Sequence, residues 1–205
     1  MDKFVYDKLQ EIIARNAELH RPSEFYTWMH NMYVGGIAIA IRRQVDERRD
    51  TISFVRFLRR LQKNPAIVSL EHYRSLWDPA DPAHAQLRGL GLFERVRDKG
   101  YAHFVGRGKE QPTKAEFEKE IRELQDLSGR VVDFASSMVA HTGQERPDEL
   151  PTFGEVNKVI DHLDALLRKY VLLFRAVDLD TGIYFQYDWT AIFRVPWIKQ
   201  KFASG

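Results

Sequence analysis

An arginine, a carboxylate and a histidine lie close together in the stretch RVRDKGYAHFV, residues 95–105. Arg97 directly precedes Asp98, and His103 follows six positions after the arginine. A guanidinium is a planar, permanently charged fork that suits a phosphate. An imidazole titrates near neutrality and can transfer a proton. Such groups supply much of what RNA cleavage without a metal requires: one acts on the 2′-hydroxyl or the leaving oxygen, and another stabilises the charge on the phosphorane.

The spacing of the motif limits this chemistry. On a regular helix, residues six apart differ by about 120° in direction and about 9 Å in height, so the side chains of Arg97 and His103 would not converge. We expect Gly100, which lies between them, to break or kink the helix. A symmetric dimer that brings two copies of the motif into one cleft is the other solution. Asp98 is placed to hold a side chain or cap a backbone group.

These residues carry a family resemblance. Arg-Asp-x-x-x-x-His is similar to the Arg-x(4–6)-His motif of the HEPN superfamily, and RDKGYAHF most resembles its abortive-infection branch, with variants of Arg-(Asn/Asp)-Lys-x-x-Ala-His. The preceding segments, above all residues 25–61, resemble that branch in order and style, and the resemblance covers about residues 1–175.

The resemblance implies a helical bundle, a homodimer, and a metal-independent endoribonuclease site shared across the dimer, with no cofactor. It also implies a role in phage defence or a toxin–antitoxin system, where an antitoxin or another protein would be a partner. By the same resemblance, Arg97 would hold the phosphate and Asp98 would orient the motif. His103 would transfer a proton or position the 2′-hydroxyl.

Three other interpretations stay open. Many members of the superfamily are non-catalytic, so the chain would instead be a HEPN-like module that binds RNA, a nucleotide or a protein. It would alternatively be a structural or antitoxin-type partner that acts through its aromatic C-terminus. Arg97 and Asp98 could also belong to a surface ion-pair face, with His103 at a helix boundary.

Basic residues surround the motif and predict where RNA would bind, because neutralising phosphates dominates nucleic-acid affinity. Tyr101 is a candidate for stacking on a base, although a place in the core is its alternative. The predicted RNA-binding residues are Arg95, Lys99, Tyr101, Arg107 and Lys109. Two other arginine-rich runs, residues 42–49 and 56–63, are also explained as solvated helix faces paired with Asp46, Glu47 and Asp50.

Helical periodicity dominates the chain and predicts an all-α, HEPN-like bundle over residues 1–178. The predicted helices cover 4–19, 22–47, 50–64, 67–76, 83–97, 114–141 and 153–177. Asp50 and Thr51 are the expected cap of the third helix, and Gly35 and Gly36 are expected to allow close contact with a neighbouring helix. The predicted core of the 114–141 helix comprises Phe117, Ile121, Leu124, Leu127, Val131, Phe134 and Met138.

The last segment, residues 179–205, differs from the rest in being rich in aromatic residues. We expect an irregular or β-hairpin extension that packs on the same domain or forms a dimer contact. Its aromatic residues are Tyr184, Phe185, Tyr187, Trp189, Phe193, Trp197 and Phe202.

Composition limits the classes of function. The 205 residues are 44% hydrophobic and 29% charged with a net charge of +2, a globular composition that does not itself require a nucleic-acid partner. The absence of cysteine excludes disulfides, cysteine-ligated zinc and a thiol nucleophile. No signal-peptide pattern is present and the longest apolar run has ten residues, so we expect a cytoplasmic protein without a membrane partner. Neither Asp81 with His84 nor the Asp161–Asp164 cluster predicts a metal site.

Overall fold

The structure, a computed structural model, describes residues 11–12, 14–15, 24–140, 150–177, 179, 188 and 191. The described residues form helices joined by loops and turns, without a strand, which confirms the predicted all-α class. Most of the predicted first helix, over residues 4–19, and most of the extension, over 179–205, lie outside the described residues, so the expected hairpin and its aromatic contacts stay predictions.

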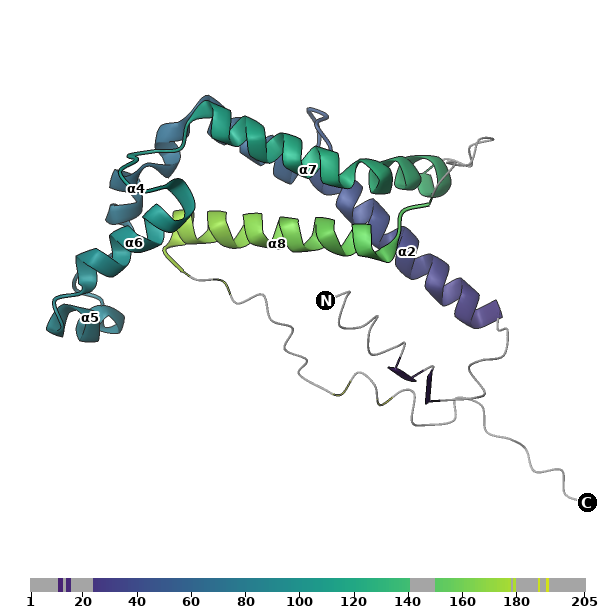
Figure 1. The fold of residues 1–205 in the computed structure, drawn as a ribbon, viewed down its shortest axis with the longest axis horizontal. Helices are drawn as coiled ribbons and strands as arrows, with labels where there is room; N and C mark the ends of the chain where they lie inside the picture. Colours follow the sequence, from purple (N-terminus) through teal and green to yellow (C-terminus); the bar gives the residue numbers. More distant parts are fainter. Residues whose placement is uncertain are drawn as a thin grey trace, which may run out of the picture.

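Four helices form the bundle: α2 (Glu24–Val45), α3 (Phe54–Lys63), α7 (Lys114–Phe134) and α8 (Phe153–Arg175). Helix α7 packs against each of the other three and is therefore central to the bundle (Figure 1). Its apolar positions recur every three or four residues, which places them along one face. Phe117, Ile121, Leu124 and Val131 are buried as predicted, whereas Leu127 is 40% exposed and Phe134 is half-buried.

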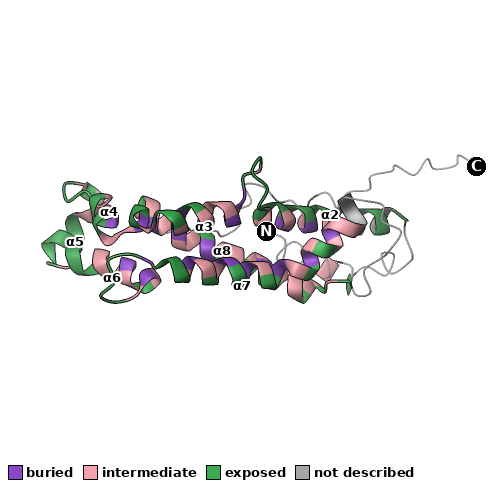
Figure 2. Ribbon diagram, turned by 90° about the horizontal axis from the view of Figure 1, so that it is seen from above, coloured by how far each residue is buried: buried purple, intermediate pink, exposed green. Residues whose placement is uncertain are grey.

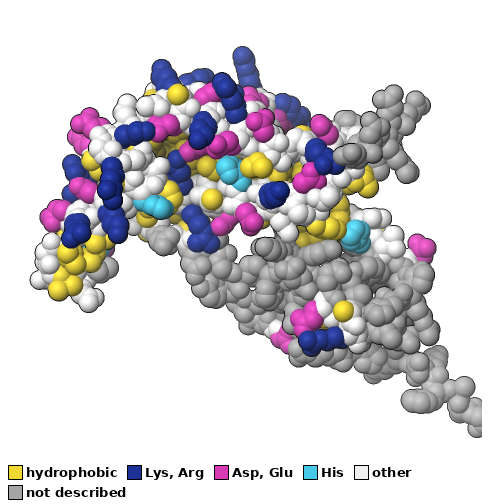
Figure 3. All heavy atoms as spheres, in the orientation of Figure 1, with side chains coloured by type: hydrophobic (Ala, Val, Ile, Leu, Met, Phe, Trp, Pro, Cys, Tyr) yellow, Lys and Arg dark blue, Asp and Glu magenta, His cyan; other side chains and the backbone are white. Residues whose placement is uncertain are grey.

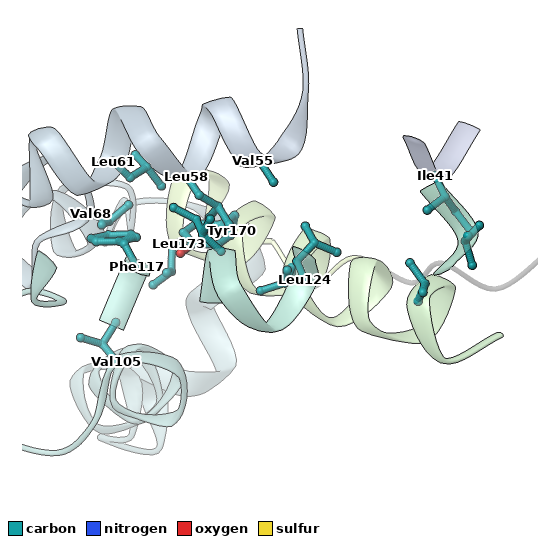
Figure 4. Packing of buried hydrophobic residues seen from close by; sticks show 14 of the residues in the cluster. Ile41, Val55, Leu58, Leu61, Val68, Val105, Phe117, Leu124, Tyr170 and Leu173 are labelled. Carbon is teal, nitrogen blue, oxygen red and sulfur yellow. The ribbon is translucent and has the colours of Figure 1, made fainter. Parts of the chain in front are cut away.

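The core includes side chains from all four bundle helices (Figure 4). Val55, Leu58 and Leu61 of α3 meet Phe117 of α7 and Leu173 of α8 there. Each of these helices has a solvent-facing side that is exposed (Figure 2). After Phe134, α7 continues into a wider π-helical turn (η4, Ala135–Ala140), so the predicted helix over 114–141 changes its hydrogen-bonding pattern near its end.

Side-chain caps start the bundle helices. The Thr113 hydroxyl accepts a hydrogen bond from the Glu116 backbone N–H, and the Glu116 carboxylate accepts one from the Thr113 N–H. Thr152 and Glu155 form the same reciprocal pair at the start of α8. The expected Asp50–Thr51 cap of α3 is wrong: Ser53 accepts the hydrogen bond from Arg56 N–H, because the helix begins only at Phe54.

Three further helices form an end region that we call the α4–α6 arm (Figure 1). It comprises α4 (Leu70–Ser75), α5 (Ala85–Gly89) and α6 (Phe93–Val105), with 3-10 turns at Pro65–Val68 and Pro82–His84. The prediction of one helix over 83–97 is wrong. The chain turns at Leu90–Leu92, where Gly91 has a φ of +65°, and a new helix then starts at Phe93.

The expectation for the glycine pair of α2 is not met at Gly36. A Cβ atom at Gly36 would meet no atom of the described residues within 4 Å, so no described helix approaches it closely. Gly36 instead lines an apolar groove between α2 and α8, with Met32 and Leu167 among the other lining residues. None of the described helices is both long enough and apolar enough to cross a bilayer.

Candidate functional site

The motif lies on one unbroken helix. Helix α6 runs from Phe93 to Val105 through Gly100, so the predicted break or kink at this glycine is wrong. The glycine serves packing instead: a Cβ atom at Gly100 would lie 3.0 Å from the Tyr73 hydroxyl oxygen of α4. Tyr73 is 1% exposed and its ring packs 5.5 Å from that of Tyr101. The absent side chain therefore lets α4 and α6 pack closely.

Arg97 and Asp98 form an ion pair that a third residue completes. The Arg97 Nε–H donates to Asp98 Oδ1 at 2.8 Å. Arg74 of α4 donates from Nε to the same oxygen at 3.1 Å and from a terminal amino group to Oδ2 at 2.5 Å. Arg74 thus holds both oxygens of the carboxylate in the two-point geometry that guanidinium groups favour. We call these three residues the arginine clamp.

The clamp fixes the charge state of Asp98. Hydrogen bonds from Arg74, followed by those from Arg97, lower the pKa of the Asp98 carboxyl from 3.8 to about 2, against an opposing effect of burial. The carboxylate is therefore ionised at every physiological pH. Two positively charged guanidinium groups share one carboxylate, so the clamp, of which the half-buried Arg97 is a member, keeps a net charge of +1.

Arg97 is the most buried member of the clamp. Its side chain is 15% exposed, compared with 34% for Asp98 and 45% for Arg74. Its guanidinium carbon lies 5.8 Å from the centre of the Phe93 ring, one helical turn earlier. The Nε group is engaged by Asp98, whereas the terminal amino groups make no hydrogen bond to another described residue. Those two groups are the ones left for a phosphate.

His103 lies on a different side of α6 from the clamp. Its side chain is exposed, and its ring centre is 4.6 Å from that of Phe104. Because α6 stays regular, Arg97 and His103 keep the separation of about 120° in direction and about 9 Å along the axis. The fold of one chain therefore does not bring the guanidinium and the imidazole together.

Two of the predicted RNA-binding residues share the side of His103. Arg95 and Lys99 precede it at intervals of four residues, so the three form one exposed stripe along α6. Arg107 is also exposed, in the loop after α6. Arg95, Lys99 and Arg107 make no ion pair with another described residue, and Figure 3 shows Lys and Arg side chains gathered over this end of the molecule.

Two other predicted RNA-binding residues are already engaged. Lys109 is exposed but forms an ion pair with Glu116, whose pKa falls to about 2 chiefly because of that contact. Tyr101 is 1% exposed, so its prediction as a base-stacking residue is wrong and its core alternative is confirmed. Its hydroxyl lies 2.9 Å from the carbonyl oxygens of both Val68 and Glu110 and ties α6 to its neighbouring loops. Burial raises the pKa of Tyr101 to about 12.

The arginine-rich runs of the bundle include the predicted acidic partners. Arg48 contacts Asp46 at 2.9 Å, and Arg59 contacts Glu47 at 3.6 Å and Glu118 at 2.5 Å. These contacts favour the interpretation of solvated, paired helix faces for these arginines. Arg48 and Arg59 are accordingly less suited to RNA than the unpaired cations of α6.

The two His–Asp groups considered as metal sites in the sequence, around His84 and His162, have other contacts in the structure. His84 stacks on Trp77 with ring centres 4.9 Å apart, and its Nδ1 lies 3.0 Å from the Asp78 carbonyl oxygen. His162 faces Glu123 and Asp126 across α7 and α8, and its Nε2 makes no hydrogen bond to another described residue. Among the described residues, no group of three or more His, Asp or Glu side chains is placed to hold a metal ion.

Sequence reasoning missed Arg74 and Tyr73. Both lie in a short helix more than twenty residues before the motif, and only the packing of α4 on α6 brings them to it. In LEHYRS the tyrosine is buried and the arginine that follows it is exposed, as on two sides of one helix. No local pattern in the sequence indicates that Arg74 pairs with Asp98. Comparison with protein-family models, with curated proteins and with solved structures finds no match for this chain.

Proposed function

We propose that the chain is a metal-independent endoribonuclease of the HEPN type that acts in phage defence or in a toxin–antitoxin system. The arginine clamp is the single observation that carries the proposal. It presents a fixed guanidinium with two amino groups unused by other described residues, held by an ionised carboxylate, on the same helix as an exposed imidazole and unpaired cations that lie on another side of it. Metal-free cleavage next to a 2′-hydroxyl needs such a phosphate ligand and such a proton carrier.

A second copy of the chain completes the proposed site. Arg97 and His103 of one chain diverge, so the two groups act together only if each site takes one from each subunit. The exposed side of α6 is suited to such a contact because it is partly apolar: Val96 is 38% exposed, and Leu90, just before the helix, is 63% exposed. In the assembled site, Arg97 of one subunit would hold the phosphate and His103 of the other would transfer the proton.

Cleavage of RNA in the presence of EDTA tests the proposal. The purified protein should cleave RNA, and Arg97→Ala or His103→Ala should each reduce the rate by about 100-fold or more. Arg122→Ala is the matched control, because Arg122 is 71% exposed on the outer side of α7 and should keep full activity. Circular dichroism should show an unchanged helix content in every variant.

A magnesium requirement, or equal activity in all variants, would contradict the proposal. Equal activity would point to a contaminating nuclease.

A non-catalytic module that binds RNA, a nucleotide or a protein is the second candidate. The divergence of Arg97 and His103 on an unbroken helix favours it, because a monomer with this geometry can bind a phosphate but cannot act on its 2′-hydroxyl. Intact RNA in a salt-dependent complex would support this candidate instead.

A further inference from the structure

Arg74 is the member of the clamp with no assigned role. It comes from α4, whereas Asp98 and Arg97 lie on α6, and its sequence neighbour Tyr73 is buried against Gly100. The packing of Tyr73 against Gly100 fixes the position of the Arg74 backbone. Arg74 is also the most exposed of the three residues, so its role is not to fill the core.

The division of contacts within the clamp is unequal. Asp98 offers two oxygens, and Arg74 contacts both, with a different nitrogen for each. Arg97 reaches only Oδ1, through Nε. A carboxylate without other partners commonly pairs with a guanidinium through two parallel hydrogen bonds. Such a pair would engage a terminal amino group of Arg97 as well as its Nε. In the structure Arg74 donates to Oδ2 and Arg97 does not, so the contact with Arg74 sets the direction in which Asp98 presents its second oxygen.

We infer that Arg74 is a positioning residue that keeps Asp98 from closing on Arg97, and so leaves the two terminal amino groups of Arg97 open to a phosphate. This inference rests on the proposed function. Without Arg74, the net charge of the clamp falls from +1 to zero, and Asp98 turns its second oxygen to Arg97. The carboxylate then competes with the phosphate for the same amino groups.

The inference predicts a specific pattern of variants. Arg74→Ala should weaken the binding of a non-cleavable 2′-O-methyl oligonucleotide by about tenfold, as expected for losing one charge-assisted hydrogen bond. The double variant Arg74→Ala/Asp98→Asn should recover most of that loss, because a neutral amide does not compete with a phosphate. Arg74→Lys should be intermediate, since an ammonium group holds one oxygen rather than two.

Arg130→Ala is the matched control. Arg130 is 45% exposed, as Arg74 is, and contacts Glu155 at 2.5 Å at the start of α8, away from the clamp. Its removal should leave oligonucleotide affinity unchanged. A loss of affinity in Arg74→Ala that the Asp98→Asn change does not recover would overturn the inference, because it would mean that Arg74 itself contacts the nucleic acid. Unchanged affinity in Arg74→Ala would overturn it as well.

A titration without RNA separates this inference from the proposed function. In ¹³C NMR, the Asp98 carboxyl should titrate near pH 2 in the native chain and closer to its ordinary value of 3.8 in Arg74→Ala. The Arg97 terminal amino protons should at the same time exchange more slowly, because Asp98 now holds one of them. A chain that neither binds nor cleaves RNA but shows both changes would refute the function and leave the role of Arg74 intact. Unchanged exchange of the Arg97 terminal amino protons in Arg74→Ala would refute that role alone.

Discussion

At the residue scale, Asp98 is the acidic group of the candidate site whose charge state the structure changes most. Asp98 accepts hydrogen bonds from two guanidinium groups, and these lower its pKa to about 2. The sequence indicated that Asp98 would hold a side chain, and the structure shows that it holds two. The sequence did not indicate Arg74, because Arg74 and Asp98 are 24 positions apart and no periodic signal pairs them. A contact between residues this far apart in the sequence depends on how the helices pack.

Asp98 makes the stability of the fold depend on acid pH. Its pKa is lower in the folded chain than its ordinary value of 3.8, so the unfolded state binds more protons between these values. The stabilisation is full above about pH 4 and is lost as the pH falls to about 2. Asp98→Asn should therefore flatten the decline in the free energy of unfolding over this range, as measured by urea denaturation at a series of pH values.

Glu116 supplies the control for this titration. Its pKa is also about 2, so it contributes a second decline that Asp98→Asn leaves in place and Glu116→Gln removes. A decline that is identical in the native chain and in Asp98→Asn would show that the clamp does not form in solution.

At the element scale, the long helices follow the sequence and the arm does not. Helices α7 and α8 have strong periodic patterns and α2 is apolar almost all round. The predicted ranges of all three agree with the structure to within a few residues at most ends. The arm is built from helices whose limits depend on single turns, such as the one at Gly91. The prediction for Gly100 was wrong because a glycine inside a helix indicates either a kink or a close neighbour. The structure shows a close neighbour, Tyr73.

Alanine at two glycines distinguishes these roles. Gly129 lies inside α7 with no atom of the described residues within 4 Å of an added Cβ, so Gly129→Ala should stabilise the fold by about 0.5–1 kcal/mol through helix propensity. Gly100→Ala gains the same propensity but presses on the buried Tyr73 hydroxyl, which should cost about 1–3 kcal/mol. Thermal and urea unfolding of both variants measure the difference.

Tyr73→Phe is the relieving change for Gly100→Ala. It removes the oxygen that the new methyl group meets, and that oxygen has no hydrogen bond to another described residue. The double variant should therefore be more stable than Gly100→Ala alone. Equal stabilisation by alanine at Gly100 and Gly129 would contradict the close packing of α4 on α6.

At the scale of the whole molecule, the net charge indicates little about which cations could bind RNA, whereas the positions of the charges indicate more. The chain has a net charge of only +2, yet the exposed stripe of α6 carries Arg95 and Lys99 without ion-pair partners among the described residues, while Arg48 and Arg59 in the bundle are paired. The sequence predicted both sets of cations as candidates. Only the fold distinguishes them, because pairing depends on which acidic residue each arginine reaches.

The salt dependence of RNA binding measures the contribution of the stripe. Each phosphate neutralised by a cation adds about 0.7 to the slope of log affinity against log salt for a single strand. Arg95→Ala and Lys99→Ala should each reduce the slope by about that amount. Lys119→Ala should not, because Lys119 is 74% exposed on α7 and lies near Glu123. Equal slopes in all three variants would place the RNA on another surface.

In the proposed dimer, one site takes Arg97 from one subunit and His103 from the other. Mixing the inactive Arg97→Ala and His103→Ala proteins after partial denaturation and refolding tests it most directly, with EDTA-resistant RNA cleavage as the readout. A shared site predicts that the mixture recovers roughly a quarter of native activity, because half of the dimers are mixed and each of these has one intact site. A mixture that forms mixed dimers and stays inactive would contradict the claim.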